Sequence, residues 1–174
     1  EAGLKYESLD GNILVNTAVY NLKEENRLVS DPANPTQNIQ AGKTTNRGFE
    51  IEVKAKVTRK LNLLANYNYT DVDEQLEALP RHQAALWGKY QIPGEEQNGL
   101  SAGAGVRWFG AFTDGNAPRT PSVTLVDAMI AYETPDWRLA LNANNIFDKV
   151  YVSTCLSRGD CWYGARRSIV ASAA

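Results

Sequence analysis

A cysteine pair and a single histidine are the residues of this 174-residue chain that most invite a chemical interpretation. Cys155 and Cys161 lie six residues apart, in a stretch that also contains Gly159. Such a pair lacks the third and fourth ligands of a zinc site, and its spacing differs from that of a redox-active CxxC motif. The spacing favours a small disulfide loop formed in an oxidising compartment, with two unrelated free thiols as the alternative.

The histidine, His82, follows Pro80 and Arg81 at the start of an expected strand. No serine, cysteine or carboxylate stands at a spacing that ties it to a catalytic constellation. A structural or surface role is therefore favoured. The sequence predicts no catalytic residue, no metal site and no enzymatic activity.

Composition excludes several classes of protein. The net charge is -2 and no basic block is present, which argues against a nucleic-acid partner. Hydrophobic residues make up 43% of the chain, too many for a disordered segment. No apolar run approaches the roughly 18–20 residues of a membrane-spanning helix. A spanning β-barrel stays possible, because it hides its apolar face in every second residue.

The clearest periodic signal is a strand at residues 49–57. Apolar and charged residues alternate there without an error, so a helix would have no apolar stripe. We expect the apolar set to face lipid and the charged set to face a barrel interior. The apolar set is Phe49, Ile51, Val53, Ala55 and Val57, and the charged set is Glu50, Glu52, Lys54 and Lys56.

Similar runs follow along the rest of the chain and predict an all-β fold. About nine strands result, most of about 9–13 residues, which matches the length needed to cross a bilayer at a tilt. They are longer than the strands of an average soluble sheet. We expect an antiparallel up-and-down meander. Its other strands are expected near residues 2–8, 13–22, 61–70, 81–92, 100–112, 126–133, 137–144 and 162–174.

The connections between these strands alternate in length. In a meander every second connection lies at the same end, so one end has tight turns and the other has long loops. That asymmetry is typical of outer-membrane barrels, with periplasmic turns and external loops. Short connections are expected near 10–12, 59–60, 93–99 and 135–136, and long ones near 23–43, 71–80, 113–121 and 148–161.

Several runs of residues resemble the C-terminal barrel strands of TonB-dependent outer-membrane receptors. They are residues 46–52, 63–70 and 141–151, of which the last holds the specific signature Asn-Asn-Ile-Phe-Asp-Lys-Val-Tyr. Three more runs are similar to the ferric-siderophore branch, in particular to hydroxamate (ferrichrome-type) receptors, and they are residues 80–82, 105–108 and 161–167. The resemblance covers nearly the whole chain in order.

This resemblance implies a function and a location. Residues 1–174 would be one C-terminal segment of a transmembrane barrel of about 22 strands, with the plug domain and the earlier strands absent. The parent receptor would bind and import ferric siderophores in the bacterial outer membrane, with energy from the TonB system. Its partners would be outer-membrane lipid, the ferric siderophore as transported ligand, and TonB through the plug region. No cofactor is implied.

The resemblance also points to ligand contacts in the cysteine loop. Candidate contact residues are Leu156, Arg158, Trp162 and Tyr163. Ferrichrome-type relatives tend to carry an aromatic residue directly after the first cysteine, where this chain has Leu156. The two aromatic candidates serve equally well as members of an interfacial aromatic girdle.

Two other functions are compatible with the residue pattern. A small closed outer-membrane barrel with a structural or adhesin role would need an even number of strands and paired termini. A soluble β-sandwich binding module would turn its apolar faces inward between two sheets. The arrangement of the strands therefore distinguishes these two alternatives from a segment of a receptor barrel.

Overall fold

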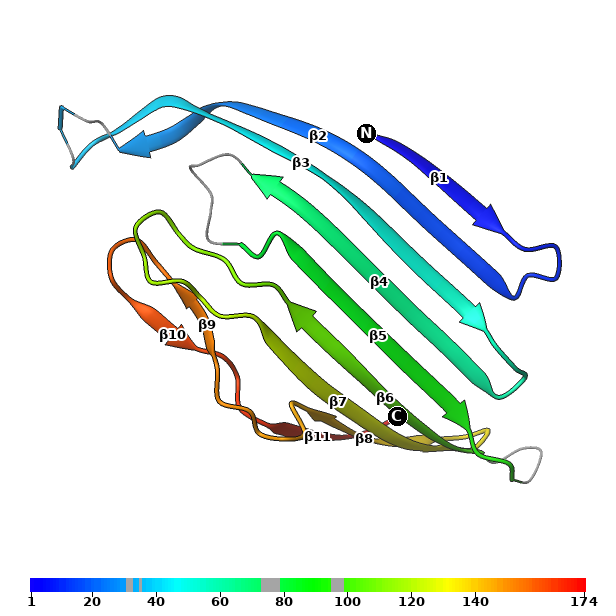
Figure 1. Cartoon of the computed structure of the whole chain (residues 1–174). Helices are drawn as coiled ribbons and strands as arrows, with labels where there is room; N and C mark the ends of the chain where they lie inside the picture. The colour runs from blue at the N-terminus through cyan, green and yellow to red at the C-terminus, as the bar shows by residue number, and fades with distance from the viewer. Residues whose placement is uncertain (31–32, 35, 73–78, 95–98) are drawn as a thin grey trace.

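The computed structural model describes residues 1–30, 33–34, 36–72, 79–94 and 99–174. All regular structure within these residues is β, and no helix there is long and apolar enough to span a membrane. Figure 1 shows the strands side by side in one layer, with a small hairpin at one end.

Nine strands form a single antiparallel sheet in the order β1-β2-β3-β4-β5-β6-β7-β8-β11, and β9 pairs with β10 in a separate hairpin. The predicted meander of about nine strands is therefore confirmed. The sheet contains β1 (Ala2–Glu7), β2 (Ile13–Ser30), β3 (Asn38–Lys56), β4 (Leu61–Val72), β5 (His82–Gln91), β6 (Gly99–Phe109), β7 (Val123–Glu133), β8 (Arg138–Asn144) and β11 (Ser168–Ala173), and the hairpin contains β9 (Val152–Cys155) and β10 (Cys161–Tyr163).

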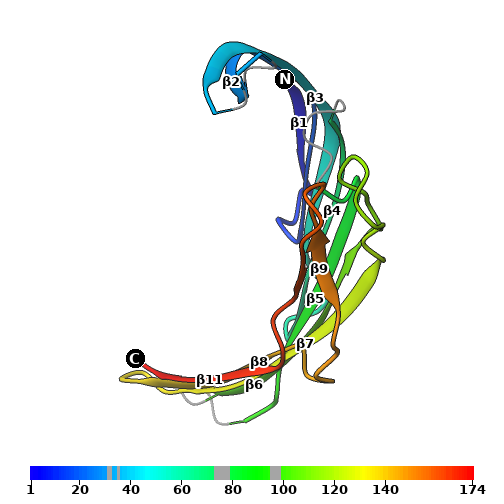
Figure 2. The same ribbon diagram turned by 90° about the vertical axis from the view of Figure 1, so that its left-hand side faces the viewer.

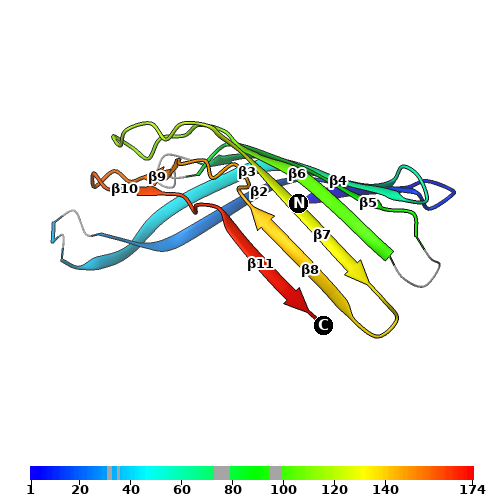
Figure 3. The ribbon, with the colours of Figure 1, turned by 90° about the horizontal axis from the view of Figure 1, so that it is seen from below.

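This order excludes the two alternative architectures. A sandwich needs a second sheet over the first, whereas these strands form one layer. A small closed barrel needs its first and last strands to pair, whereas β1 and β11 are the two ends of the sheet order. Figure 3 shows β11 beside β8 with its other edge open.

The register keeps each kind of side chain on one face across neighbouring strands. Phe49 of β3 lies opposite Val19 of β2 and Tyr69 of β4. Its neighbour Glu50 lies opposite Ala18 and Asn68. Because residues directly opposite each other share a face, the alternation read in β3 extends into the adjoining strands.

The sheet is strongly curved and appears as an open C in Figure 2. On the concave face of β1–β4, a hollow of about 610 Å³ is lined in large part by polar side chains. These polar residues of the concave face include Asn16, Glu50, Glu52, Asn66 and Asn68. The opposite, convex face carries exposed apolar side chains such as Leu86, Ile130 and Leu141, which need an apolar environment.

The two ends of the sheet differ as the connection lengths predict. At one end, which we call the turn end, residues 8–12, 57–60 and 134–137 make tight hydrogen-bonded turns. At the other, the loop end, lie the β2–β3 hairpin, residues 110–122 and the β9–β10 hairpin (Figure 1). The expected connections at 71–80 and 93–99 lie partly outside the described residues.

The loop predicted for residues 23–43 is wrong. Strands β2 and β3 stay paired as far as Ser30 and Asn38, across a register shift between Glu24 and Leu28. Asn26, with φ of 60°, supplies the left-handed residue of this bulge. Residues 23–26 are all polar, and the absence of an apolar face led to the prediction of a loop. Backbone pairing does not require an apolar face where both sides of the strand are exposed.

The strand predicted for residues 162–174 is also wrong as a single element. The chain forms β10, leaves regular structure at residues 164–167, and then enters the sheet as β11. The expected long loop at 148–161 accordingly contains β9. Contacts at residues 164–167 explain the interruption between β10 and β11.

The register makes a testable prediction for the convex face. Val53, Ala65 and Leu86 share one row of this face, about midway between Tyr69 and Tyr90. In the membrane-embedded parent barrel, Val53→Arg should lower the free energy of unfolding by about 2–4 kcal/mol, because the charge meets hydrocarbon. Urea unfolding in lipid vesicles measures this value.

Lys54→Arg is the matched control, since Lys54 lies one residue away on the opposite face. It should change the free energy of unfolding little. Equal destabilisation by the two substitutions would contradict the assignment of faces.

Candidate functional site

The cystine hairpin, residues 152–163, is the main feature at the loop end. A disulfide joins Cys155 to Cys161, the pairing that their spacing predicts. The two cysteines lie directly opposite each other in the β9–β10 ladder. Leu156 donates its N–H to the carbonyl of Asp160 (2.8 Å), and Gly159 turns the chain with φ of 104°. The hairpin is therefore short and covalently closed.

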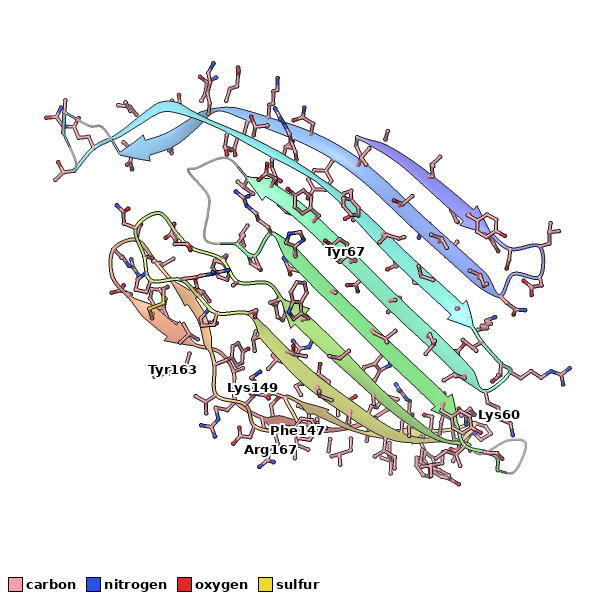
Figure 4. All side chains as sticks on the ribbon, in the orientation of Figure 1. Lys60, Tyr67, Phe147, Lys149, Tyr163 and Arg167 are labelled. Carbon is pink, nitrogen blue, oxygen red and sulfur yellow. A yellow bond between two sulfur atoms is a disulfide. The ribbon has the colours of Figure 1, made fainter. Side chains whose placement is uncertain are left out.

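Two of the four predicted contact residues meet in this hairpin. The guanidinium of Arg158 lies 5.2 Å from the centre of the Trp162 ring and also pairs with the carboxylate of Asp160. Leu156 is half-buried at the start of the turn, and Tyr163 is exposed at the end of β10 (Figure 4). The hairpin therefore presents a cation on an aromatic ring, an arrangement that suits a polar organic ligand.

A pocket of about 270 Å³ lies beside the base of the hairpin. Most of its lining is apolar, and it joins the ends of β5 and β6 to the segment that enters β9. The sequence did not single out these residues as a site. The lining includes Leu79, Gln83, Phe109, Phe112, Thr120, Pro121, Val123, Tyr151 and Ser153.

The base of the site is fixed to the sheet by a carboxylate of β7. Asp127 is buried, and both of its oxygens accept hydrogen bonds from the guanidinium of Arg107 on β6. One of these oxygens also accepts the backbone N–H of Asn145 (2.9 Å). A bidentate, charge-assisted pair fixes the orientation of the Asp127 carboxylate as well as its distance from Arg107. The bond from this carboxylate to Asn145 therefore fixes the path of the chain after β8.

The side chain of Asn145 adds to the contacts of Arg107 and Asp127, and we call these three residues the anchor. Its amide oxygen accepts the N–H of Lys149 (2.9 Å), and its amide nitrogen donates to the carbonyls of Lys149 (2.9 Å) and Ala165 (3.2 Å). It adopts φ of 50°, which asparagine tolerates better than most residues. The specific signature of the sequence is thus the turn that joins β8 to the cystine hairpin.

Asp148 ties the incoming and outgoing halves of this connection together. Its carboxylate accepts hydrogen bonds from Nε and Nη2 of Arg166 and from the backbone N–H of Arg167. The bonds from Arg166, followed by that from Arg167, hold the pKa of Asp148 well below its usual range. The same contact raises the pKa of Arg166. These bonds account for the irregular residues 164–167 before β11.

Gly164 allows the two halves to approach each other. It donates its N–H to the carbonyl of Tyr151 (2.8 Å). A Cβ atom at Gly164 would lie 1.9 Å from the Tyr151 ring, so a larger residue would displace the ring. Tyr151 also lines the pocket, and its position there depends on this glycine.

Residues 1–146 match the family of TonB dependent receptor-like β-barrels. The chain belongs to this family. TonB-dependent receptor barrels lie in the bacterial outer membrane, so the location inferred from the sequence is confirmed, as is the membership of the barrel fold.

Curated relatives include the ferrichrome outer membrane transporter/phage receptor of Escherichia coli, 34% identical over 99% of this chain and 25% of the relative. The ferrioxamine B receptor of Salmonella typhimurium is also 34% identical, over 99% of this chain and 27% of the relative. The chain therefore spans about a quarter of the length of these receptors and transporters.

Solved TonB-dependent receptor structures give the same result. The siderophore receptor PiuA of Acinetobacter baumannii superposes with a TM-score of 0.75 and 25% identity, over 98% of this chain and 27% of that one. The ferripyoverdine receptor of the Pseudomonas aeruginosa outer membrane, bound to ferripyoverdine, gives 0.74 and 25%, over 98% and 26%.

The anchor of this receptor segment makes a testable prediction. Asn145→Gly keeps the left-handed backbone available but removes three side-chain hydrogen bonds of a residue that is 3% exposed. The free energy of unfolding of the complete receptor should fall by about 1–3 kcal/mol, because backbone groups of Lys149 and Ala165 lose their partners. Urea unfolding measures this change.

The neighbouring Asn144→Gly is the matched control. Its amide makes one long hydrogen bond to Ser168 (3.4 Å) at an exposed position, so its loss should cost at most about 0.5–1 kcal/mol from backbone entropy. A larger effect at Asn144 than at Asn145 would contradict the anchor.

A pH prediction follows from Asp148. Because folding lowers its pKa, the contact with Arg166 contributes fully above the unfolded-state pKa of about 3.9 and weakens as the pH falls below it. A nitroxide at the exposed Val150 should stay immobile from pH 7 to about pH 4 and gain mobility only below that. In Asp148→Asn it should be mobile at every pH. A wild-type transition between pH 7 and pH 5 would contradict this assignment.

Proposed function

We propose that this chain forms part of the wall and ligand entrance of an outer-membrane receptor that binds and imports ferric siderophores. The observation that carries the proposal is the loop-end site of a chain that belongs to the TonB-dependent receptor family. The names of its relatives, which include ferrichrome and ferrioxamine receptors, support a chelate of the hydroxamate class.

The proposed site combines two surfaces of different chemistry. The pocket beside the hairpin offers Phe109, Phe112 and Tyr151 to the organic periphery of a chelate. The hairpin offers Arg158 and Trp162, which suit oxygen atoms and flat groups. In this proposal Leu156 and Tyr163 add contact area at the edge.

Orientation follows from the two ends of the sheet. In outer-membrane barrels short turns face the periplasm and long loops face outward, so the loop end would be extracellular and would meet the ligand first. The convex apolar face would contact outer-membrane lipid, and the concave polar face would line the barrel lumen. Coupling to TonB would reside in a plug region outside this chain.

The role of the protein in this proposal is transport and not catalysis. The ferric siderophore is cargo that passes through the receptor, so no resident cofactor is required. Recognition must be strong enough to capture a dilute chelate and must leave the chelate chemically unchanged.

The proposal is tested by ligand binding to the complete receptor, with ferrichrome as the probe. Trp162→Ala should raise the Kd at least about 30-fold, because aromatic residues of this kind carry a large share of binding energy. Isothermal titration calorimetry gives the value.

Trp137→Ala is a closely matched control. Trp137 and Trp162 are each 42% exposed, but Trp137 lies at the turn end, against Tyr132. It should leave the Kd unchanged. Wild-type protein that fails to bind ferric hydroxamates, or equal losses in the two variants, would overturn the proposed function.

A further inference from the structure

The cystine hairpin has backbone N–H groups that it cannot satisfy itself. The bond from the Leu156 N–H to the Asp160 carbonyl lies next to the Cys155–Cys161 pair, which is the pattern of a non-hydrogen-bonded pair. Their Cα–Cα distance of 4.0 Å agrees with this, since such pairs approach to about 4.5 Å. The N–H of Cys155 therefore points away from the partner strand.

A neighbouring loop accepts this N–H. Cys155 donates to Oγ1 of Thr120 (3.1 Å). Cys155 is 4% exposed and Thr120 is 2% exposed, so water has little access to replace the bond. An unpaired N–H at this depth would carry the full cost of desolvation.

A second bond joins the tip of the hairpin to the same loop. Ser157 is the second residue of the turn that the Gly159 N–H closes on the Leu156 carbonyl, so its own N–H is free of the turn. It donates to Oδ2 of Asp114 (2.8 Å). One contact is thus buried at the end of β9, directly before the turn, and the other is exposed at the tip of the turn.

The accepting loop, residues 110–121, has its own internal bracing. Phe112 and Thr120 exchange two backbone hydrogen bonds (3.1 and 2.8 Å), and Ala117 closes a turn on the carbonyl of Asp114 (2.8 Å). The two acceptors are therefore held in place on a loop that connects β6 to β7.

We propose that Asp114 and Thr120 are positioning residues that latch the cystine hairpin to loop 110–121, so that the two loops form one unit. The inference rests on the proposed function, in which the hairpin presents Arg158 and Trp162 to the ligand. The disulfide closes the hairpin on itself, whereas the latch sets its direction relative to the pocket. Neither bond replaces the other.

The latch is tested by hydrogen–deuterium exchange of the peptide that covers residues 152–158 in the complete, ligand-free receptor. Thr120→Val keeps the side-chain shape and removes the acceptor, so exchange should be about fivefold to tenfold faster. Asp114→Ala, at an exposed position, should accelerate exchange at the tip.

Two substitutions serve as controls. Thr120→Ser keeps a hydroxyl, and Asp160→Asn alters only the ion pair with Arg158 inside the hairpin. Neither should accelerate exchange at Cys155. Unchanged exchange in both Thr120→Val and Asp114→Ala would overturn the latch, and Asp114→Ala decides the matter if Thr120→Val does not fold.

Binding of ferrichrome gives the second measurement. Asp114→Ala, whose side chain does not line the pocket, should raise the Kd about tenfold while the thermal unfolding midpoint of the barrel stays the same. Faster exchange with an unchanged Kd would overturn the positioning role. Faster exchange in the variant, together with wild-type protein that binds no ferric hydroxamate, would uphold the latch and overturn the proposed function.

Discussion

Continuous backbone pairing in one register is the constraint on which the rest of this structure depends. The side-chain period of a strand is two, so a slip of one residue in any strand would exchange its two faces. Few apolar side chains among the described residues are buried, and those that are buried include small ones such as Ala117, Ala131 and Ala140. The sheet is therefore ordered by its ladders and by contrasting surroundings on its two faces, and much less by a packed core.

The same constraint explains the position of the candidate site. One row of the concave face contains Glu50, Asn68, Gln83, Phe109 and Val123 in successive strands. Polar residues begin this row, and Phe109 and Val123 make it apolar at β6 and β7. Both line the pocket at the loop end. The register thus places an apolar end of this row beside the segment that enters β9.

The connection from β8 to the hairpin pairs with a part of β7 that β8 leaves unpaired. Strand β7 pairs with β8 only from Ala128 onward, which leaves the edge of residues 123–127 without a strand. The chain after β8 takes over this edge, because Ile146 donates its N–H to the carbonyl of Val126 and Lys149 reaches that of Thr124. Figure 4 shows Phe147, Lys149 and Arg167 gathered in this region. The signature residues therefore end one strand pair and direct the chain toward the cystine hairpin.

The sequence predicted most of the sheet and less of its loop end. Alternation in residues 49–57 was sufficient to assign a strand and its faces, because each face meets a uniform environment. The extension of β2 and β3 was not predictable in this way, since a ribbon exposed on both sides imposes no alternation on residues 23–26. Likewise, Gly164 and Asp148 break the predicted final strand through contacts with residues that are distant in sequence.

The candidate site shows the same division in physical terms. The cysteine spacing predicted the disulfide because a short covalent loop depends only on local geometry. Arg107 and Asp127 were not predicted as a pair, since they lie 20 residues apart and meet only through the β6–β7 register. No pattern in the sequence points to Thr120. Its hydroxyl nevertheless accepts the N–H of Cys155, which has no acceptor within the hairpin. A candidate site built from loops is therefore recognised only when the unsatisfied backbone groups of each loop are traced to their partners.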